Sequence, residues 1–298
     1  MEWLVSALGL LVVLLVLRDI FHTLWHPRGF GTLVRRVFAL IWRMARAFNR
    51  RTGRSTELAG PVGLLAAVGA WAVLLVAGWA VVYLPHMPEG FHFSKPPFPE
   101  QPADLESSAY LSLVAVTTLG LGDIVPADPV LRVLVPLEAL VGFLLFTAAI
   151  SWILQIYPAL VRRRSLARRL AVLSGTPGTV ELLERGEGGA PLLGSLTAEL
   201  ATVEMDLRMY GETYYFRERD RELSLAAQLP VVQRLVAAGA GSPSAEVRHA
   251  ARVLEGGLAA FADCVAGVVG ISGELPELLA GFAADHQQEQ AAVGEGPD

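Results

Sequence analysis

The sequence contains almost no cysteine and almost no lysine. Cys264 is the single cysteine in 298 residues, so the chain can form no internal disulfide bond and offers no cluster of thiolates for a metal ion. Lys95 is the single lysine, and the other strongly basic residues are all arginines. The formal net charge of −5 gives no sign of a nucleic-acid partner.

The sequence also lacks the signatures of several regulatory and catalytic modules. It has no G-x-G-x-x-G fingerprint, no EF-hand loop and no arginine ladder inside a hydrophobic run. These absences argue against a Rossmann nucleotide sensor, an EF-hand calcium sensor and a steep voltage sensor. No nucleophile is accompanied by a base and an orienting group, so we expect no enzymatic activity and no cofactor.

What the sequence does have is long uncharged runs. It is 53% hydrophobic with a mean hydropathy of +0.46, and residues 3–17, 58–85 and 139–157 carry no charge. The second and third runs can cross a hydrocarbon core about 30 Å thick, and the first can do so if its helix continues. Because Glu2 replaces a basic start and no small-residue cleavage site follows, we interpret residues 1–26 as a membrane helix and not as a signal peptide.

The arginines indicate how these helices are oriented. Eight arginines lie within residues 27–57 and five within residues 162–169, whereas residues 86–129 hold six acids and one lysine. Positive charge accumulates on the cytoplasmic side of a membrane protein. We therefore expect a multi-pass protein of the plasma membrane, with its N-terminus outside and a cytoplasmic helical domain over residues 159–298.

Residues 32–51, within the cytoplasmic segment 27–57, have the pattern of an amphipathic helix. Five arginines fall on one arc of the helix, and apolar residues occupy the opposite side. We favour a helix in the cytoplasmic membrane interface, with its arginines at anionic lipid headgroups; packing on the cytoplasmic domain is the alternative. The arginines on this arc are Arg35, Arg36, Arg43, Arg46 and Arg50.

A loop and a short helix are expected before the third run. Residues 85–105 follow an outer helix over 60–84 and contain six prolines, which predicts an extended outer loop. Residues 106–118 form an apolar run too short to cross the bilayer, with acids and serines at its start as at a helix N-terminus. Such a helix can enter the membrane and point its negative C-terminal end at a cation.

The residues that follow suit a pathway lined by backbone. In the stretch Thr117-Thr118-Leu119-Gly120-Leu121-Gly122-Asp123, the two glycines can adopt left-handed conformations that bring successive carbonyls to one side. Thr118 adds a hydroxyl to this row. Non-helical backbone at membrane depth is tolerated only where it lines a water-filled cavity or is buried in protein, and a ring of carbonyls can replace the hydration shell of an ion.

This stretch resembles the selectivity filter of prokaryotic potassium channels of the pore-loop superfamily, which have two membrane helices around a filter. The resemblance covers residues 107–157 and rests on the filter followed by Asp123 and Ile124-Val125-Pro126. It implies a tetrameric cation-channel fold with a pore domain over 58–158 and an inner helix over 131–157. With the extra N-terminal membrane helix and the helical cytoplasmic domain expected above, the whole chain is predicted to be an all-α membrane protein. Because each chain supplies one filter, four identical chains are expected.

The resemblance also assigns roles to individual residues. K⁺ is expected at the filter carbonyls, with support from Thr117 and Asp123, and a hinge is expected at Gly142 of the inner helix. The filter residues 118–122 depart from the family pattern at two positions: Leu119 replaces the usual valine, and Leu121 replaces the usual tyrosine or phenylalanine. Leu121 cannot donate a hydroxyl hydrogen bond to the pore helix. A weakly selective cation channel and a non-conducting membrane sensor or scaffold therefore remain as alternatives. The filter carbonyls expected to bind K⁺ are those of Thr118, Leu119, Gly120, Leu121 and Gly122.

Polar residues inside the third run have two interpretations. Thr147, Ser151 and Gln155 share one helical face, which could line the cavity below the filter or bond neighbouring helices. Glu138 lies on the opposite side, and we expect it to form a pair behind the filter, with Arg132 of a neighbouring chain as one candidate partner.

Asp19, His22 and His26 share one face of the first helix near its cytoplasmic end. Ionisable groups in a membrane helix are candidates for function, here a divalent metal site or a pH sensor. We favour a cluster of hydrogen bonds between helices over either role. Farther along, the aromatic stretch Tyr210–Phe216 is expected to pack in a core or a subunit contact.

Overall fold

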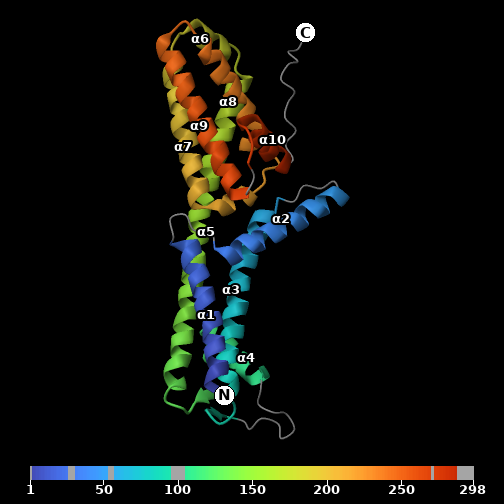
Figure 1. Ribbon diagram of the computed structural model, residues 1–298, viewed down its shortest axis with the longest axis vertical. Helices are drawn as coiled ribbons and strands as arrows, with labels where there is room; N and C mark the ends of the chain where they lie inside the picture. The colour runs from blue at the N-terminus through green and yellow to red at the C-terminus, as the bar shows by residue number, and fades with distance from the viewer. Residues whose placement is uncertain (1, 26–30, 53–56, 95–104, 270–271, 287–298) are drawn as a thin grey trace. The chain divides into compact units, whose positions relative to one another are not determined.

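The computed structural model describes residues 2–25, 31–52, 57–94, 105–269 and 272–286 (Figure 1). Helices dominate this part of the chain, as expected for an all-α membrane protein. The elements in chain order are α1 (Glu2–Leu24), α2 (Thr32–Thr52), α3 (Ala59–Tyr83), the 3₁₀ helix η1 (Leu84–His86), β1 (Phe91–Phe93), α4 (Leu105–Val116), β2 (Ile124–Pro126), α5 (Leu131–Gly175), α6 (Thr179–Arg185), α7 (Gly189–Met209), η2 (Gly211–Tyr215), α8 (Leu225–Ala240), α9 (Ala245–Val269) and α10 (Leu275–Asp285).

The helices α1, α3 and α5 are long and apolar enough to cross a membrane. The expected set of three membrane helices is therefore confirmed. Helix α1 packs closely on α3, since a Cβ atom added at Gly9 would lie 2.5 Å from the carbonyl oxygen of Gly78. Close approach at small residues is typical of helices that pack together within a membrane.

The chain divides into two compact units. The membrane unit comprises residues 1–39 and 62–154, and the helical unit comprises residues 40–61 and 155–298. Helices α2 and α5 contribute residues to both. Helix α5 does not end at residue 157, where the apolar run ends, but continues to Gly175. It continues because apolar residues recur at helical spacing in this stretch and are buried in the helical unit; they are Ala159, Leu160, Leu166, Ala167 and Leu170.

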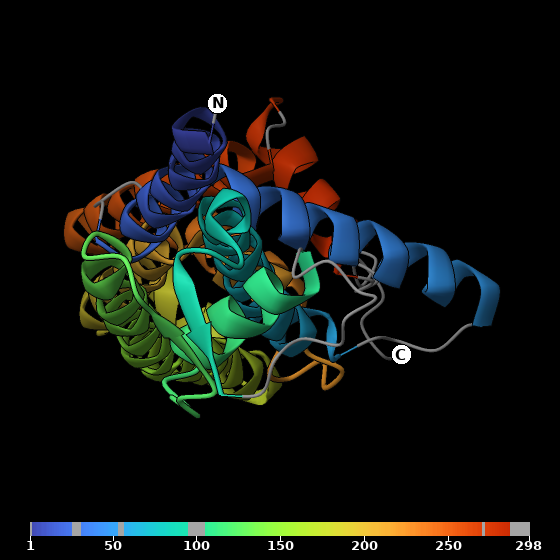
Figure 2. The same cartoon turned by 90° about the horizontal axis from the view of Figure 1, so that it is seen from below.

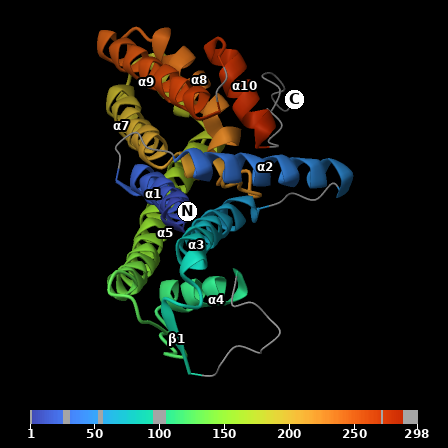
Figure 3. The ribbon, with the colours of Figure 1, turned by 60° about the horizontal axis from the view of Figure 1, so that its bottom comes forward.

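The core of the helical unit lies among α7, α8 and α9, which run side by side (Figures 1 and 3). Each of these helices buries one apolar face. Helix α7 contributes Leu193, Leu196, Leu200, Val203 and Leu207, and α9 contributes Val247, Ala251, Leu254, Leu258 and Phe261. The aromatic stretch is part of this interior, since Tyr214, Tyr215 and Phe216 are buried as expected.

The arginines of α5 that follow the apolar run have protein partners. All five form ion pairs with acids of the helical unit, so their role is not confined to orienting the chain in the membrane. Arg163 also donates hydrogen bonds to the carbonyls of Thr213 and Phe216, at 2.6 and 2.8 Å, and so holds η2 in place. The pairs are Arg162–Asp206, Arg163–Glu218, Arg164–Glu218, Arg168–Glu222 and Arg169–Glu199.

Two short strands lie at the end of the membrane unit that carries α4, which Figure 2 views from below. Strand β1 pairs with β2 in antiparallel fashion, with Phe91 opposite Pro126 and Phe93 opposite Ile124. The sequence predicts only an extended loop before α4. The two strands were not predicted, because three residues are too few to show an alternating pattern. The pairing fixes the chain directly after the predicted filter.

Candidate functional site

Helix α4 is the short helix that the sequence predicts before the filter. Its 12 residues span about 18 Å, less than the thickness of a hydrocarbon core. Glu106 lies in its first turn, where a carboxylate interacts favourably with the helix dipole. At its other end the amide of Leu119 donates to the carbonyl of Val114 at 3.0 Å, so the loop that follows is tied to the last turn.

The loop after α4 has an alternating backbone. Thr118, Gly120 and Gly122 have φ values of 57°, 55° and 73°, and the residues between them are not left-handed. In an ordinary strand successive carbonyls point to opposite sides, whereas a left-handed residue at every second position turns them to the same side. The left-handed conformation expected for the two glycines is confirmed. Thr118 adopts it too, although steric repulsion of the Cβ atom makes this conformation unfavourable for residues other than glycine.

The far end of the loop is held by one side chain of α4 and by backbone amides. Tyr110 of α4 donates a 2.6 Å hydrogen bond to a carboxylate oxygen of Asp123. The other carboxylate oxygen of Asp123 accepts from the amide of Ile124 at 3.1 Å. The amide of Ser94, next to β1, donates to the carbonyl of Asp123 at 2.8 Å. Asp123 therefore connects the loop to the short helix and to the two-stranded sheet.

Glu138 of α5 is fully buried and bonded within its own chain. Its carboxylate accepts hydrogen bonds from the phenol of Tyr83 at 2.6 Å and from the hydroxyl of Ser112 at 2.5 Å. Ser112 also lies 3.0 Å from the carbonyl of Val76. The carboxylate thus joins α3, α4 and α5 at one point. Arg132 of a neighbouring chain, one candidate partner, is not needed to satisfy it.

Gly142 lies where α5 crosses the end of α4. A Cβ atom added there would lie 2.0 Å from the carbonyl oxygen of Val116, a distance that no side chain tolerates. Helix α5 is continuous through this position. Close approach of two backbones therefore explains this glycine, and the hinge implied by the family resemblance stays a proposal.

The three polar residues in the apolar part of α5 do not share one environment within a single chain. Thr147 and Ser151 are exposed. Each hydroxyl donates a 3.0 Å hydrogen bond to the backbone carbonyl four residues earlier in α5. Gln155 belongs to the helical unit, where its side-chain oxygen accepts a 2.9 Å hydrogen bond from Tyr210. The two hydroxyl residues remain candidates for the lining of a cavity between chains.

Asp19 is occupied by hydrogen bonds between helices. Its carboxylate accepts from the indole of Trp71 at 3.0 Å and from the backbone amide of Leu33 at 3.0 Å, in the first turn of α2. A carboxylate at that position interacts favourably with the N-terminus of a helix. Among the described residues no group of three potential ligands could hold a metal ion. His26 lies outside the described residues, and the metal role is not supported by the partners of Asp19.

Comparison with known proteins agrees with this geometry. Residues 69–157 match the family model described as ion channel, from the middle of α3 to the apolar part of α5. This segment is therefore similar to ion-channel domains. The resemblance to two-helix pore-loop channels recognised in the sequence is thereby confirmed for the part of the chain that carries the loop.

A relative from Bacillus subtilis (strain 168), the uncharacterized membrane protein YdjJ, is 26% identical over 172 residues. The match covers 57% of this chain and 49% of that protein, so the chain spans about half the length of this relative. No solved structure matches the chain.

Sequence reasoning did not predict the partners of three residues of this site. Tyr110, Tyr83 and Ser112 supply the hydroxyls that hold Asp123 and Glu138. The available signal was a tyrosine and a serine within the apolar part of the short helix, Ala109–Val116. Tyr110 and Ser112 are two residues apart, so they point in different directions. That difference indicates separate partners for the two side chains.

Proposed function

We propose that this protein is a homotetrameric channel that conducts K⁺ passively through the carbonyls of residues 118–122. The observation that carries the proposal is the left-handed backbone at Thr118, Gly120 and Gly122, directly after the short helix of a segment similar to ion-channel domains. A row of carbonyls on one side can replace the hydration shell of a monovalent cation when four rows surround an axis. The C-terminal end of α4 adds a negative dipole beside this row.

The exposure of single-chain surfaces supports assembly. The side chains of Leu119 and Leu121 are 63% and 57% exposed in one chain, although they belong to a tightly constrained loop. Large apolar side chains are also exposed along α5, among them Phe143 and Phe146. A four-fold arrangement would cover such residues with neighbouring chains and with lipid.

The arginine distribution supports an orientation in the plasma membrane with the N-terminus outside and the helical unit in the cytoplasm. Helix α2 supports the proposed placement at the cytoplasmic interface for one of its two apolar faces. It buries one face, which includes Phe38 and Trp42, and it exposes a second apolar face with Leu40, Met44 and Phe48. Packing on protein therefore explains one face of this helix. The membrane interface explains the other face, which is available to lipid.

A weakly selective cation channel is the second candidate. Leu121 favours it, because the residue between the two glycines lacks the hydroxyl that would bond the short helix. A sensor or scaffold without conduction would keep the same fold and would show no flux.

Ion flux in liposomes tests these proposals. Purified protein is reconstituted, and reversal potentials are measured in K⁺ and Na⁺ gradients. We expect a clear preference for K⁺; equal reversal potentials would support the weakly selective candidate, and silent tetramers would support the scaffold. Thr118→Ala should reduce conduction or selectivity, whereas Thr202→Ala, on the exposed side of α7, should leave both unchanged. If Thr118→Ala is also without effect, the filter assignment is wrong.

Labelling tests the orientation separately. A membrane-impermeant label at the N-terminus should react from outside the cell, and one at the C-terminus should react only after permeabilisation. The reverse pattern would contradict the proposed topology without affecting the filter.

A further inference from the structure

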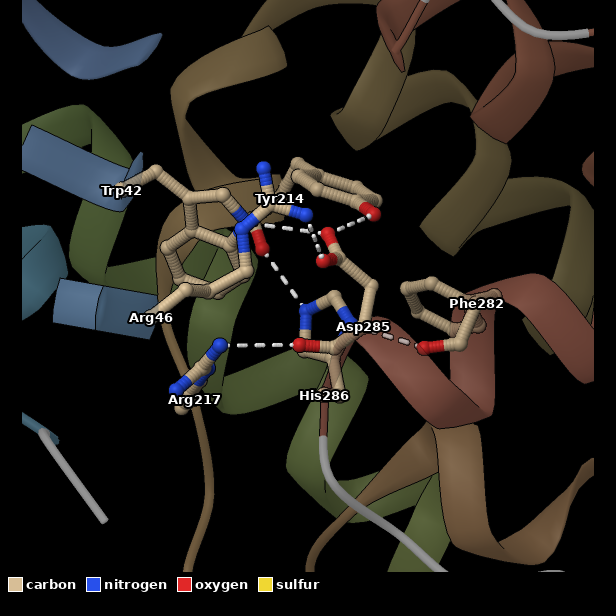
Figure 4. A network of polar contacts seen from close by, with 7 residues as sticks. All are labelled: Trp42, Arg46, Tyr214, Arg217, Phe282, Asp285 and His286. Atoms are coloured by element: carbon tan, nitrogen blue, oxygen red, sulfur yellow. Dashed lines mark hydrogen bonds and ion pairs between the residues drawn. The ribbon is translucent and has the colours of Figure 1, made fainter. Parts of the chain in front are cut away.

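The helical unit contains a convergence of hydrogen-bond donors on Asp285, the last residue of α10 (Figure 4). One carboxylate oxygen accepts from the indole of Trp42 at 2.9 Å and from the phenol of Tyr214 at 2.7 Å. The other accepts from the guanidinium of Arg46 at 2.8 Å. Trp42 and Arg46 come from α2, and Tyr214 comes from η2.

Arg217 completes this cradle, which we define as Trp42, Arg46, Tyr214 and Arg217. Its guanidinium lies 4.2 Å from the centre of the Trp42 ring and donates to the backbone carbonyl of Asp285 at 2.9 Å. The side chain is 5% exposed, yet its Nε and Nη1 atoms have no hydrogen-bond partner among the described residues. Buried donors without partners are costly, so the cradle offers more hydrogen-bonding capacity than Asp285 uses.

The position of Asp285 is unfavourable for a carboxylate in one respect. The C-terminus of a helix carries partial negative charge, which disfavours an acid in the last turn. The two arginines of the cradle oppose that effect. Burial, followed by the neighbouring charge of Arg163, lowers the pKa of the adjacent His286 to about 4. The cradle therefore carries two positive charges against the single charge of Asp285.

We propose that the cradle is a binding site for a phosphate group and that the carboxylate of Asp285 occupies the place of that ligand in this structure. A phosphate offers more acceptor oxygens than a carboxylate and matches the forked donors of an arginine. It would replace the three contacts to the carboxylate and engage the unused donors of Arg217. To vacate the site, the last turn of α10 has to open and carry Asp285 and the buried His286 away from the cradle.

The phosphate could belong to a lipid headgroup or to a soluble ligand. Leu40, Met44 and Phe48, on the exposed face of α2, lie on the helix that supplies Trp42 and Arg46. These three side chains point away from Trp42 and Arg46 around the helix, so the apolar face alone does not decide between the two sources. The inference concerns binding and stands independently of ion conduction.

Binding of inorganic phosphate to the full chain in a neutral detergent tests the site. The readout is the rise of the thermal unfolding midpoint with phosphate, compared with chloride at matched ionic strength. Asp285→Asn removes the competing charge and keeps the side-chain volume. We expect it to bind phosphate about tenfold more tightly than the unaltered chain, the change given by one charge-assisted contact.

Two further variants make this result specific. Asp206→Asn removes a carboxylate that also pairs with an arginine, Arg162, elsewhere in the unit, and it should give no gain. Arg217→Gln, added to Asp285→Asn, should abolish the gain. An equal gain in both single variants, or a gain that survives Arg217→Gln, would overturn the proposal.

A lipid comparison then identifies the source of the phosphate. The unaltered chain and Arg217→Gln are placed in nanodiscs of phosphatidylcholine with or without phosphatidylglycerol, and separately in phosphatidylcholine with added phosphate. Stabilisation by phosphatidylglycerol that requires Arg217 identifies a lipid ligand, and stabilisation by added phosphate that requires Arg217 identifies a soluble one. If neither stabilisation depends on Arg217, no phosphate site exists here.

Discussion

The phenol of Tyr110 lies 2.6 Å from the carboxylate of Asp123, so a pore-helix side chain holds the outer end of the proposed filter. In the filters that this loop resembles, a tyrosine between the two glycines can bond the pore helix. Leu121 stands at that place here and offers no hydroxyl. Here the tyrosine belongs to the helix and donates its hydrogen bond to an acid of the loop.

Tyr110→Phe tests this bond while keeping the aromatic ring. We expect the K⁺ to Na⁺ permeability ratio to fall severalfold, because the outer carbonyls lose an anchor and the ring deforms more easily around a smaller ion. Reversal potentials in liposomes measure the ratio. Asp123→Asn weakens the same bond from its other end and should act in the same direction; unaltered selectivity in both variants would contradict a role for this contact.

Leu121→Tyr should raise the permeability ratio by adding a hydroxyl beside the filter. A net hydrogen bond contributes about 0.5–1.5 kcal/mol, and four chains multiply it. Ser112 is already engaged with Glu138 and Val76, so the partner has to come from another pore-helix group. Leu121→Phe is the control, since it adds the ring without the hydroxyl. Equal ratios for the two variants would show that the missing hydroxyl does not limit selectivity.

Gly142→Ala should destabilise the membrane unit by about 1–3 kcal/mol, the usual cost of overpacking. The added methyl would lie 2.0 Å from the carbonyl oxygen of Val116, so the end of the pore helix has to move. The thermal unfolding midpoint and the conductance report this displacement. Gly69→Ala is a matched control in α3, where nothing lies within 4 Å of the added Cβ. A variant of Gly142 as stable as that control would exclude tight packing at the crossing.

Acidification should weaken the helical unit through His286. The two ring nitrogens lie 3.0 and 2.8 Å from the carbonyl oxygens of Phe282 and Tyr214, but burial and Arg163 lower the pKa from 6.5 to about 4. The unfolded chain takes up a proton below about pH 6.5, and the folded chain does so only near pH 4. Stability is therefore unaffected above pH 7 and decreases as the pH falls between these values.

Unfolding midpoints at pH 7.5 and 5 measure this decrease. His286→Gln should reduce the difference between the two conditions, because glutamine does not titrate. His249→Gln alters an exposed histidine of α9 and should leave the difference unchanged. The same pH dependence in both variants would show that His286 is not its source.

Much of the membrane unit could be predicted from local patterns. Charge-free runs identify α1, α3 and α5 because the bilayer imposes a length on apolar helices, and the two glycines of the loop identify its left-handed backbone. The contacts of Glu138 could not be predicted, because Tyr83 and Ser112 lie 55 and 26 residues away in the sequence. A one-dimensional pattern shows that a buried carboxylate needs a partner but not which hydroxyl approaches it.

The amphipathic helix shows a different limit. Its pattern of arginines and apolar residues fits a membrane surface, and the exposed side chains of Met44 and Phe48 agree with that interpretation. The pattern does not show that Trp42 and Arg46 bind Asp285, about 240 residues later. A helix with one apolar face on protein and a second on lipid has a sequence pattern that resembles a helix with one broad apolar face. The cradle of the helical unit was therefore not expected from the sequence.

The buried position of Glu138 has a consequence for how the chain enters the membrane. Ionisable groups inside a membrane helix are costly unless they are paired, and Glu138 lies about two turns from the start of α5. Its hydrogen-bond partners, Tyr83 and Ser112, both precede it in the chain and are synthesised first. The order of synthesis thus supplies the receiving groups before the acid emerges from the ribosome, and α3 and α4 serve as an internal scaffold for the biogenesis of α5.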